Sequence, residues 1–167
     1  MSVLVWLEAT GFGTFVRQGQ SLLAYPTFLT LHTFGLTIVV GLSAIMAARL
    51  TGLAPTIPLA PLKKLFPIIW VGFVINTISG SGLAAASAVK TLPNPFFIAK
   101  MTFVLLAVAV MAVLQVKVFR DPAVDDKRLD TMSKVLGGSL LVLWLLAMIT
   151  GRLIGYSTDL VSPVFGP

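Results

Sequence analysis

Residues 25–48, YPTFLTLHTFGLTIVVGLSAIMAA, form an almost uninterrupted apolar run that contains the only histidine of the chain, His32. A run of about 20 apolar residues is long enough to cross the hydrocarbon core of a bilayer as a helix. Pro26 suits the opening turn of such a helix, and Arg49 follows the run. The stretch therefore predicts a membrane-spanning helix with a histidine inside it.

The composition of the whole chain is typical of an integral membrane protein. Of 167 residues, 57% are hydrophobic and only 11% are charged, which is too few to cover a soluble surface. The net charge of +6 does not indicate a nucleic-acid partner, because Lys and Arg stand at the ends of apolar runs. Since the chain has no cysteine, disulfides, thiolate metal sites and cysteine nucleophiles are excluded.

Prolines and charge clusters divide the chain into four predicted spans. They cover residues 25–48, 65–89, 96–116 and 135–156. Asn94 and Pro95 are a plausible cap and first-turn pair for the third span. The proline-rich connector 51–64 favours extended polyproline geometry over helix.

Residues 3–20 mix apolar and polar side chains and predict a short interfacial helix. No soluble domain remains, so we expect one all-α membrane domain over residues 1–167. The expected fold is an up-down bundle of four transmembrane helices plus this N-terminal helix.

The distribution of basic residues predicts the orientation. The connectors between the first and second spans and between the third and fourth hold eight of the 12 Lys and Arg residues. The positive-inside rule then places both connectors in the cytoplasm. We therefore expect a multi-pass protein of the bacterial inner (cytoplasmic) membrane with both termini on the periplasmic side.

Three ionisable side chains fall inside the spans, near their outer ends. At roughly 1.5 Å per residue, His32 lies about 10 Å below the outer end of its span, and Lys100 and Arg152 lie about 6 Å below theirs. Such side chains cost several kcal/mol unless they are paired or wetted, which makes them candidates for function. The sequence therefore predicts that they converge on a pocket near the outer face.

Structural roles for the same residues remain open. His32 can hydrogen-bond a backbone carbonyl or hydroxyl of a neighbouring helix, and Lys100 and Arg152 can extend into the headgroup layer. Trp144, Met148, Arg152 and Tyr156 recur every four residues and are expected to share a face. Packing explains the methionines and this stripe as well as ligand binding does.

A binding role makes His32, Lys100, Met101, Met148, Arg152 and Tyr156 the candidate cofactor-binding residues. A neutral imidazole can ligate haem iron or copper, so His32 is also the candidate metal ligand. A methionine sulfur can supply a second ligand, and the two cations can neutralise haem propionates. Haem b is the leading candidate cofactor, with quinone or copper as the other possibilities.

Hydrolytic motifs such as HExxH and GxSxG are absent, and no paired carboxylates occur within the spans. The function expected from the sequence is therefore that of a small non-catalytic membrane subunit. It would pack in a homo-oligomer or a larger membrane complex, with an outer-side polar pocket around His32. The alternatives are a redox carrier that binds haem b or quinone there and a transporter of copper or a small molecule.

Several motifs follow one another in order along nearly the whole chain. They are Tyr25-Pro26, Leu31-His32, Arg49 to Gly52, Asn94 to Phe97 with Lys100, and Gly151 to Tyr156. The set resembles a bacterial family of four-helix integral membrane proteins known as a domain of unknown function. That resemblance implies a short N-terminal helix and four spans, and it implies no activity.

The layout is also loosely similar to copper-resistance membrane proteins and b-type membrane cytochromes, which are helical bundles with histidines. This chain departs from both because it has a single histidine. Haem ligation by two histidines would therefore need His32 from a second copy.

Overall fold

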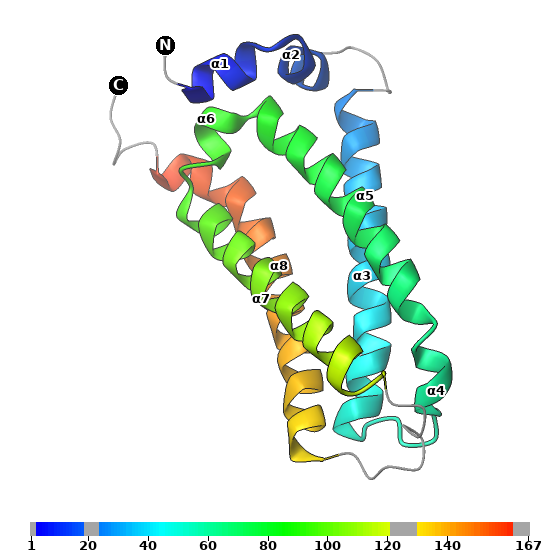
Figure 1. Cartoon of the computed structure of the whole chain (residues 1–167). Helices are drawn as coiled ribbons and strands as arrows, with labels where there is room; N and C mark the ends of the chain where they lie inside the picture. The colour runs from blue at the N-terminus through cyan, green and yellow to red at the C-terminus, as the bar shows by residue number, and fades with distance from the viewer. Residues whose placement is uncertain (1–2, 19–23, 121–129, 162–167) are drawn as a thin grey trace.

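The computed structural model describes residues 3–18, 24–120 and 130–161, and it is helical with no strand in these ranges. The elements in order are α1 (Val3–Ala9), α2 (Gly11–Gln18), α3 (Tyr25–Thr51), α4 (Leu59–Leu62), α5 (Leu65–Ala86), α6 (Ala88–Thr91), α7 (Pro95–Lys117) and α8 (Thr131–Val161). The predicted all-α fold is confirmed. Figure 1 shows the long helices running side by side, with α1 and α2 across one end and α4 at the other.

Four segments are long and apolar enough to cross a membrane. They are Tyr25–Thr51, Leu59–Ala86, Pro95–Lys117 and Thr131–Ser157. The up-down bundle of four spans is therefore confirmed, with ends that differ by a few residues from those expected. Among the span ends nearest α1, the largest difference is at the end of the second span, which was predicted at residue 89. In the structure α5 ends at Ala86, because Ser87 has a non-helical φ of −140° and ψ of 44°.

The structure differs in detail from two local expectations, and residues 19–20 of the expected N-terminal helix lie outside the described ranges. Within the proline-rich connector Pro58 is extended, with φ −67° and ψ 145°, but Leu59–Leu62 then form the short helix α4. A proline in a first helical turn loses no hydrogen bond, so Pro61 does not prevent this turn. The predicted helix 3–20 is divided at Thr10, whose hydroxyl accepts a hydrogen bond from the Gly13 N–H at 3.1 Å and so caps α2.

The predicted start of α7 is confirmed. The Asn94 side chain accepts a hydrogen bond from the Phe96 N–H at 2.9 Å, and Pro95 follows it in the first turn. The Asn94 amide also donates to the Ser157 hydroxyl at 2.8 Å, and both residues are buried. This bond joins the start of α7 to Ser157, the last residue of α8 whose side chain the structure describes.

Asp130 plays the same capping role for α8. Its carboxylate accepts hydrogen bonds from the Ser133 hydroxyl at 2.5 Å and from the Ser133 N–H at 2.9 Å. These bonds lower the pKa of Asp130 below its usual value. A carboxyl group with a lowered folded-state pKa stabilises the fold above its unfolded-state pKa, and this contribution is lost as the pH falls through the folded-state value.

We therefore expect Asp130→Asn to be less stable than the wild type at neutral pH. The difference should shrink as the pH falls below 3.8, the ordinary pKa of the group. Thermal unfolding in detergent over a pH series measures it. An offset between the two proteins that stays constant from neutral to acid pH would exclude a contribution from the ionised cap.

The long helices pack in the pairs α3 with α5, α7 with α8, and α3 with α8. By contrast, α5 and α7 make little direct contact in the described chain, although both flank the same interior. The buried apolar cluster fills the interior between α3, α7 and α8 and extends to α4 and the start of α5. Its largest fully buried members are Phe66, Phe119, Met46, Leu50, Leu59, Ile69, Met111, Leu114 and Leu140. The unfilled side of the bundle therefore lies between α5 and α7.

Candidate functional site

His32 and Asn76 join α3 to α5 through a reciprocal pair of hydrogen bonds. The imidazole Nδ1–H donates to the Asn76 carbonyl oxygen at 3.0 Å, and the Asn76 side-chain amide donates to the His32 carbonyl oxygen at 2.9 Å. The Ser79 hydroxyl lies 3.4 Å from Nδ1 and donates its own proton to a carbonyl of α5. The expectation that His32 bonds a backbone carbonyl of a neighbouring helix is confirmed.

Glycines make this close approach possible. A Cβ at Gly35 would lie 2.7 Å from the Asn76 nitrogen and 2.8 Å from the Gly72 oxygen. A Cβ at Gly80 would lie 2.8 Å from His32 Cε1. Side-chain carbons rarely come this close to other atoms, so α3 and α5 can approach only because these positions lack a Cβ. Gly35 and Gly80 therefore serve the contact between α3 and α5.

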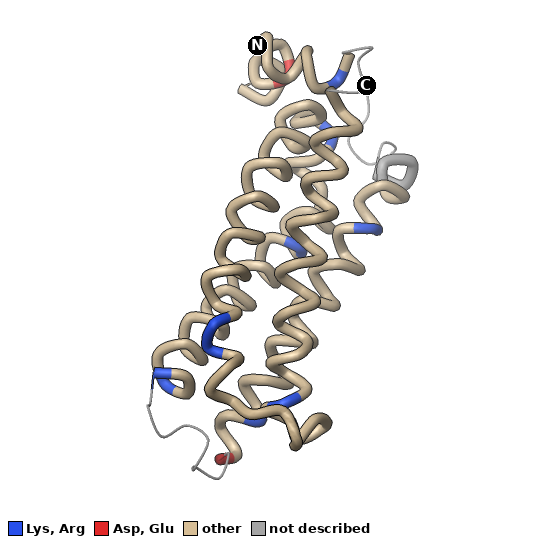
Figure 2. Tube along the Cα trace, turned by 90° about the vertical axis from the view of Figure 1, so that its right-hand side faces the viewer, with Lys and Arg blue, Asp and Glu red and all other residues tan. Residues whose placement is uncertain are grey.

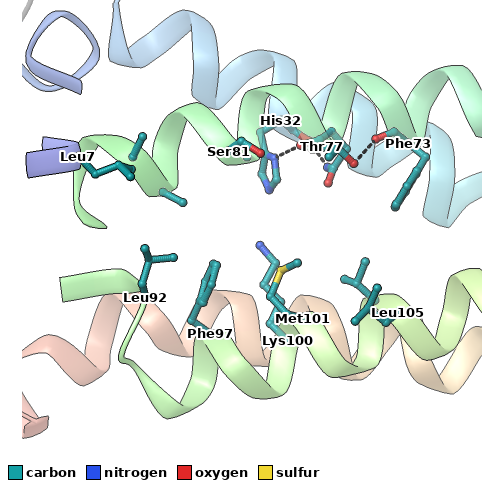
Figure 3. Close-up of a pocket in the computed structure, with 15 residues that line it drawn as sticks. Leu7, His32, Phe73, Thr77, Ser81, Leu92, Phe97, Lys100, Met101 and Leu105 are labelled. Carbon is teal, nitrogen blue, oxygen red and sulfur yellow. Dashed lines mark hydrogen bonds between the residues drawn. The ribbon is translucent and has the colours of Figure 1, made fainter. Parts of the chain in front are cut away.

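The bond to Asn76 fixes the tautomer of His32. A carbonyl oxygen can only accept, so the proton of the neutral imidazole is on Nδ1 and the lone pair is on Nε2. No described residue hydrogen-bonds Nε2. Figure 3 shows the ring leaving the helix pair and projecting into the space between α5 and α7.

That space is a cleft of about 460 Å³, which is within the range of small-molecule sites. α5 and α7 form its two walls, and Leu7 of α1 lies at one end. The walls are mostly apolar, with Phe73 and Ala84 on α5 and Phe97 and Leu105 on α7. A ligand with an apolar body therefore suits the cleft.

Lys100 enters the cleft from α7. Figure 3 shows its side chain extending toward His32 from the opposite wall. The stem packs against α8, where a Cβ at Gly151 would lie 3.3 Å from Lys100 Cδ. No hydrogen-bond acceptor or acidic side chain pairs with its ammonium in the described ranges. The cleft thus contains a cation without a counterion.

The other predicted site residues divide into two groups. Met101 lines the cleft beside Lys100. Met148, Arg152 and Tyr156 are exposed and do not line it, and the Arg152 guanidinium lies 5.8 Å from the centre of the Tyr156 ring. The structure therefore brings together His32, Lys100 and Met101, and it places Arg152 on another surface of α8. A binding role for each of the six residues remains a prediction.

Helical geometry explains why the α8 residues leave the site. Four residues make slightly more than one turn, so a row at every fourth position rotates by about 40° at each step. Trp144 is buried, with 2% of its surface exposed, while Tyr156 is 63% exposed. The row therefore starts with Trp144 on the face of α8 toward the bundle interior and ends with Tyr156 on its outer face.

Two features of the site were not predicted. Asn76 was not predicted as a partner of His32, because a sequence does not show which helices are neighbours. The position of Leu7 depends on Glu8, which accepts hydrogen bonds from the Val89 N–H at 2.8 Å and from Arg17 at 3.0 Å. These contacts fix α1 against α2 and α6, and no local motif signals them.

The charges of the bundle lie mainly at its two ends. Figure 2 shows Lys and Arg gathered there, with few of them along the spans. Among the described side chains, no group of three or more His, Asp or Glu residues could hold a metal ion, and the chain has no Cys. Any metal at His32 would therefore need a ligand of another kind, such as a porphyrin or a methionine.

Comparison of the chain with protein-family models, with curated proteins and with solved structures finds no match.

Proposed function

We propose that this protein is a small non-catalytic membrane subunit that binds a lipid-soluble ligand between α5 and α7. The polar head of the ligand sits between His32 and Lys100, and its apolar body lies along the cleft. The observation that carries the proposal is a pair of polar groups without partners among the described residues, the Nε2 lone pair and the Lys100 ammonium, which face each other between apolar walls. Both side chains are half-buried, and a polar group that faces apolar walls inside a span is costly without a partner, so a ligand head removes that cost.

The proposed membrane is the bacterial inner membrane, with the α1 end of the bundle on the periplasmic side. The excess of Lys and Arg in the connectors at the α4 end supports this orientation. The cleft then lies in the outer half of the bilayer, since Lys100 is roughly 7.5 Å along α7 from Pro95. Membership in the bacterial family whose motifs the chain resembles is part of this proposal.

The subunit is further proposed to pack in a homo-oligomer or a larger membrane complex. Large apolar side chains face outward from three spans, and Phe34, Ile78 and Val116 are each more than 55% exposed without lining the cleft. Lipid covers such surfaces, and another helix can replace the lipid at little cost. The size of the purified protein in nanodiscs tests this part independently of the ligand.

Filling the cleft tests ligand binding. Ala84→Trp places an indole on the α5 wall, so we expect it to reduce the lipid-soluble ligand recovered with the purified protein by at least about tenfold. The matched control is Ile78→Trp, which adds the same side chain to the exposed outer face of α5. Native mass spectrometry measures the bound ligand. Equal recovery from both variants would contradict the proposal.

Haem b is the second candidate ligand, and two observations favour it. A haem-ligating histidine commonly donates its other ring N–H to a carbonyl, as Nδ1 of His32 does. Met101 lies on the opposite wall and would supply a thioether sulfur as a second ligand. A Soret band that His32→Ala removes would establish haem, and a colourless protein that retains another ligand would exclude it.

A further inference from the structure

We propose that the ligand of this cleft is a lipid-soluble weak acid. The head of this amphiphile carries one acidic O–H group, either a carboxylic acid or the hydroxyl of a quinol. The inference rests on the proposed function and names the class of molecule that the site takes. It follows from the donors and acceptors that His32 and Lys100 present to the cleft.

The two side chains make opposite demands on a ligand. With its proton on Nδ1, His32 presents only an acceptor, the Nε2 lone pair. The Lys100 ammonium has three donors and no acceptor. A head that satisfies both must donate one hydrogen bond and accept another at neighbouring positions. A carboxylic acid and a phenolic hydroxyl both do this.

Lipid heads without an O–H group satisfy only half of the site. An ester or a quinone carbonyl accepts from Lys100 but leaves the Nε2 lone pair without a donor. A phosphodiester is ionised and has no proton to offer Nε2. Discrimination of this kind depends on the polar group that the wrong ligand leaves unpaired.

The same pair of residues accommodates ionisation of the head. If the ligand proton moves from its oxygen to Nε2, the products are an oxyanion and an imidazolium, and no other bond changes. Lys100 then forms a charge-assisted hydrogen bond with the oxyanion. The total charge of the site with its ligand is the same before and after the transfer. No oxidant, reductant or metal is needed.

The rest of the cleft suits a single apolar chain. Beyond His32 and Lys100, Phe73 and Leu105 face each other from α5 and α7 toward the α4 end. This direction leads into the bilayer interior, because Lys100 lies near the opposite end of its span. A head at Lys100 therefore places its tail at a depth where lipid chains already lie.

Oleic acid labelled with carbon-13 at its carboxyl carbon tests the inference, using the full-length protein in phosphatidylcholine nanodiscs. We expect a distinct bound carboxyl signal. Two unlabelled competitors then distinguish a carboxylic acid from a quinol hydroxyl: oleic acid, and decylubiquinol kept reduced under nitrogen. Displacement of the labelled oleic acid by either competitor supports the inference. Methyl oleate is the matched control without an O–H, and it is expected to displace nothing.

Three lysine variants locate the binding. Lys100→Met is expected to weaken oleic acid binding by roughly 10- to 100-fold, whereas Lys100→Arg keeps a cation and retains binding. Lys90→Met is the control, since Lys90 is exposed on α6 and does not line the cleft.

Displacement by methyl oleate as effective as by oleic acid, or unchanged affinity in Lys100→Met, would overturn the weak-acid inference. If the purified protein carries a lipid without an acidic O–H group, and Ala84→Trp removes that lipid, the weak-acid inference would be overturned. The proposed function would remain in place. If no ligand of any kind is found and Ala84→Trp behaves like Ile78→Trp, both fail.

Discussion

Replacing Gly35 by alanine is expected to destabilise the protein by about 3 kcal/mol and to separate α3 from α5. The added Cβ would meet two backbone atoms of α5, the Asn76 nitrogen at 2.7 Å and the Gly72 oxygen at 2.8 Å. Backbone atoms cannot move aside as the end of a flexible side chain can. The helices must therefore shift, and the reciprocal bonds between His32 and Asn76 must lengthen.

Gly41→Ala is the matched control on the same helix. A Cβ at Gly41 has no atom within 4 Å, so the substitution gains helix propensity without a clash. We expect it to be neutral or to stabilise by up to about 1 kcal/mol. Chemical denaturation in detergent measures both variants. If Gly35→Ala were as stable as Gly41→Ala, the close contact between α3 and α5 would be wrong.

The second large effect is a gain in stability when Lys100 is replaced by methionine. An ammonium inside a membrane span costs about 2.5–3.5 kcal/mol at the helix centre and less near its end. Lys100 has no counterion among the described residues and lies in the first two turns of α7. We therefore expect Lys100→Met to stabilise the ligand-free protein by about 1–2 kcal/mol. Thermal unfolding of delipidated protein in detergent provides the measurement.

Lys90→Met provides the comparison, because an exposed surface lysine contributes little to stability and the change should be close to neutral. Saturating ligand should then stabilise the wild type more than Lys100→Met, since only the wild type retains the cation. A Lys100→Met protein less stable than the wild type without ligand would show that the ammonium has a stabilising partner. The cation would then not be available to a ligand.

The four spans could be predicted because each is a long apolar run bounded by proline or charge. Asn94 and Pro95 marked the start of α7 in the same local way, and the side chain of Asn94 caps it. The division of the N-terminal helix at Thr10 and the turn at Ser87 were not predicted, since each depends on hydrogen bonds of one or two residues.

For the candidate site, the sequence predicted how deep each residue lies in its span, but not the direction in which its side chain points. His32 and Lys100 were placed near one end of their spans, and the structure brings them to one cleft. Arg152 has a similar depth but a different direction, because rotation about the helix axis and helix neighbours decide where a side chain points. The gap between α5 and α7 depends on how helices distant in sequence pack, and no sequence pattern reports it.

The protonation of His32 is the most direct test, because the site depends on the lone pair that faces Lys100. The chain has one histidine, so labelling with nitrogen-15 histidine and a purification tag without histidine yields a single imidazole signal. In ligand-free protein near neutral pH, we expect Nδ1 to be protonated and hydrogen-bonded and Nε2 to be unprotonated. A proton on Nε2 with a bare Nδ1 would contradict both the bond to Asn76 and the binding site built on it.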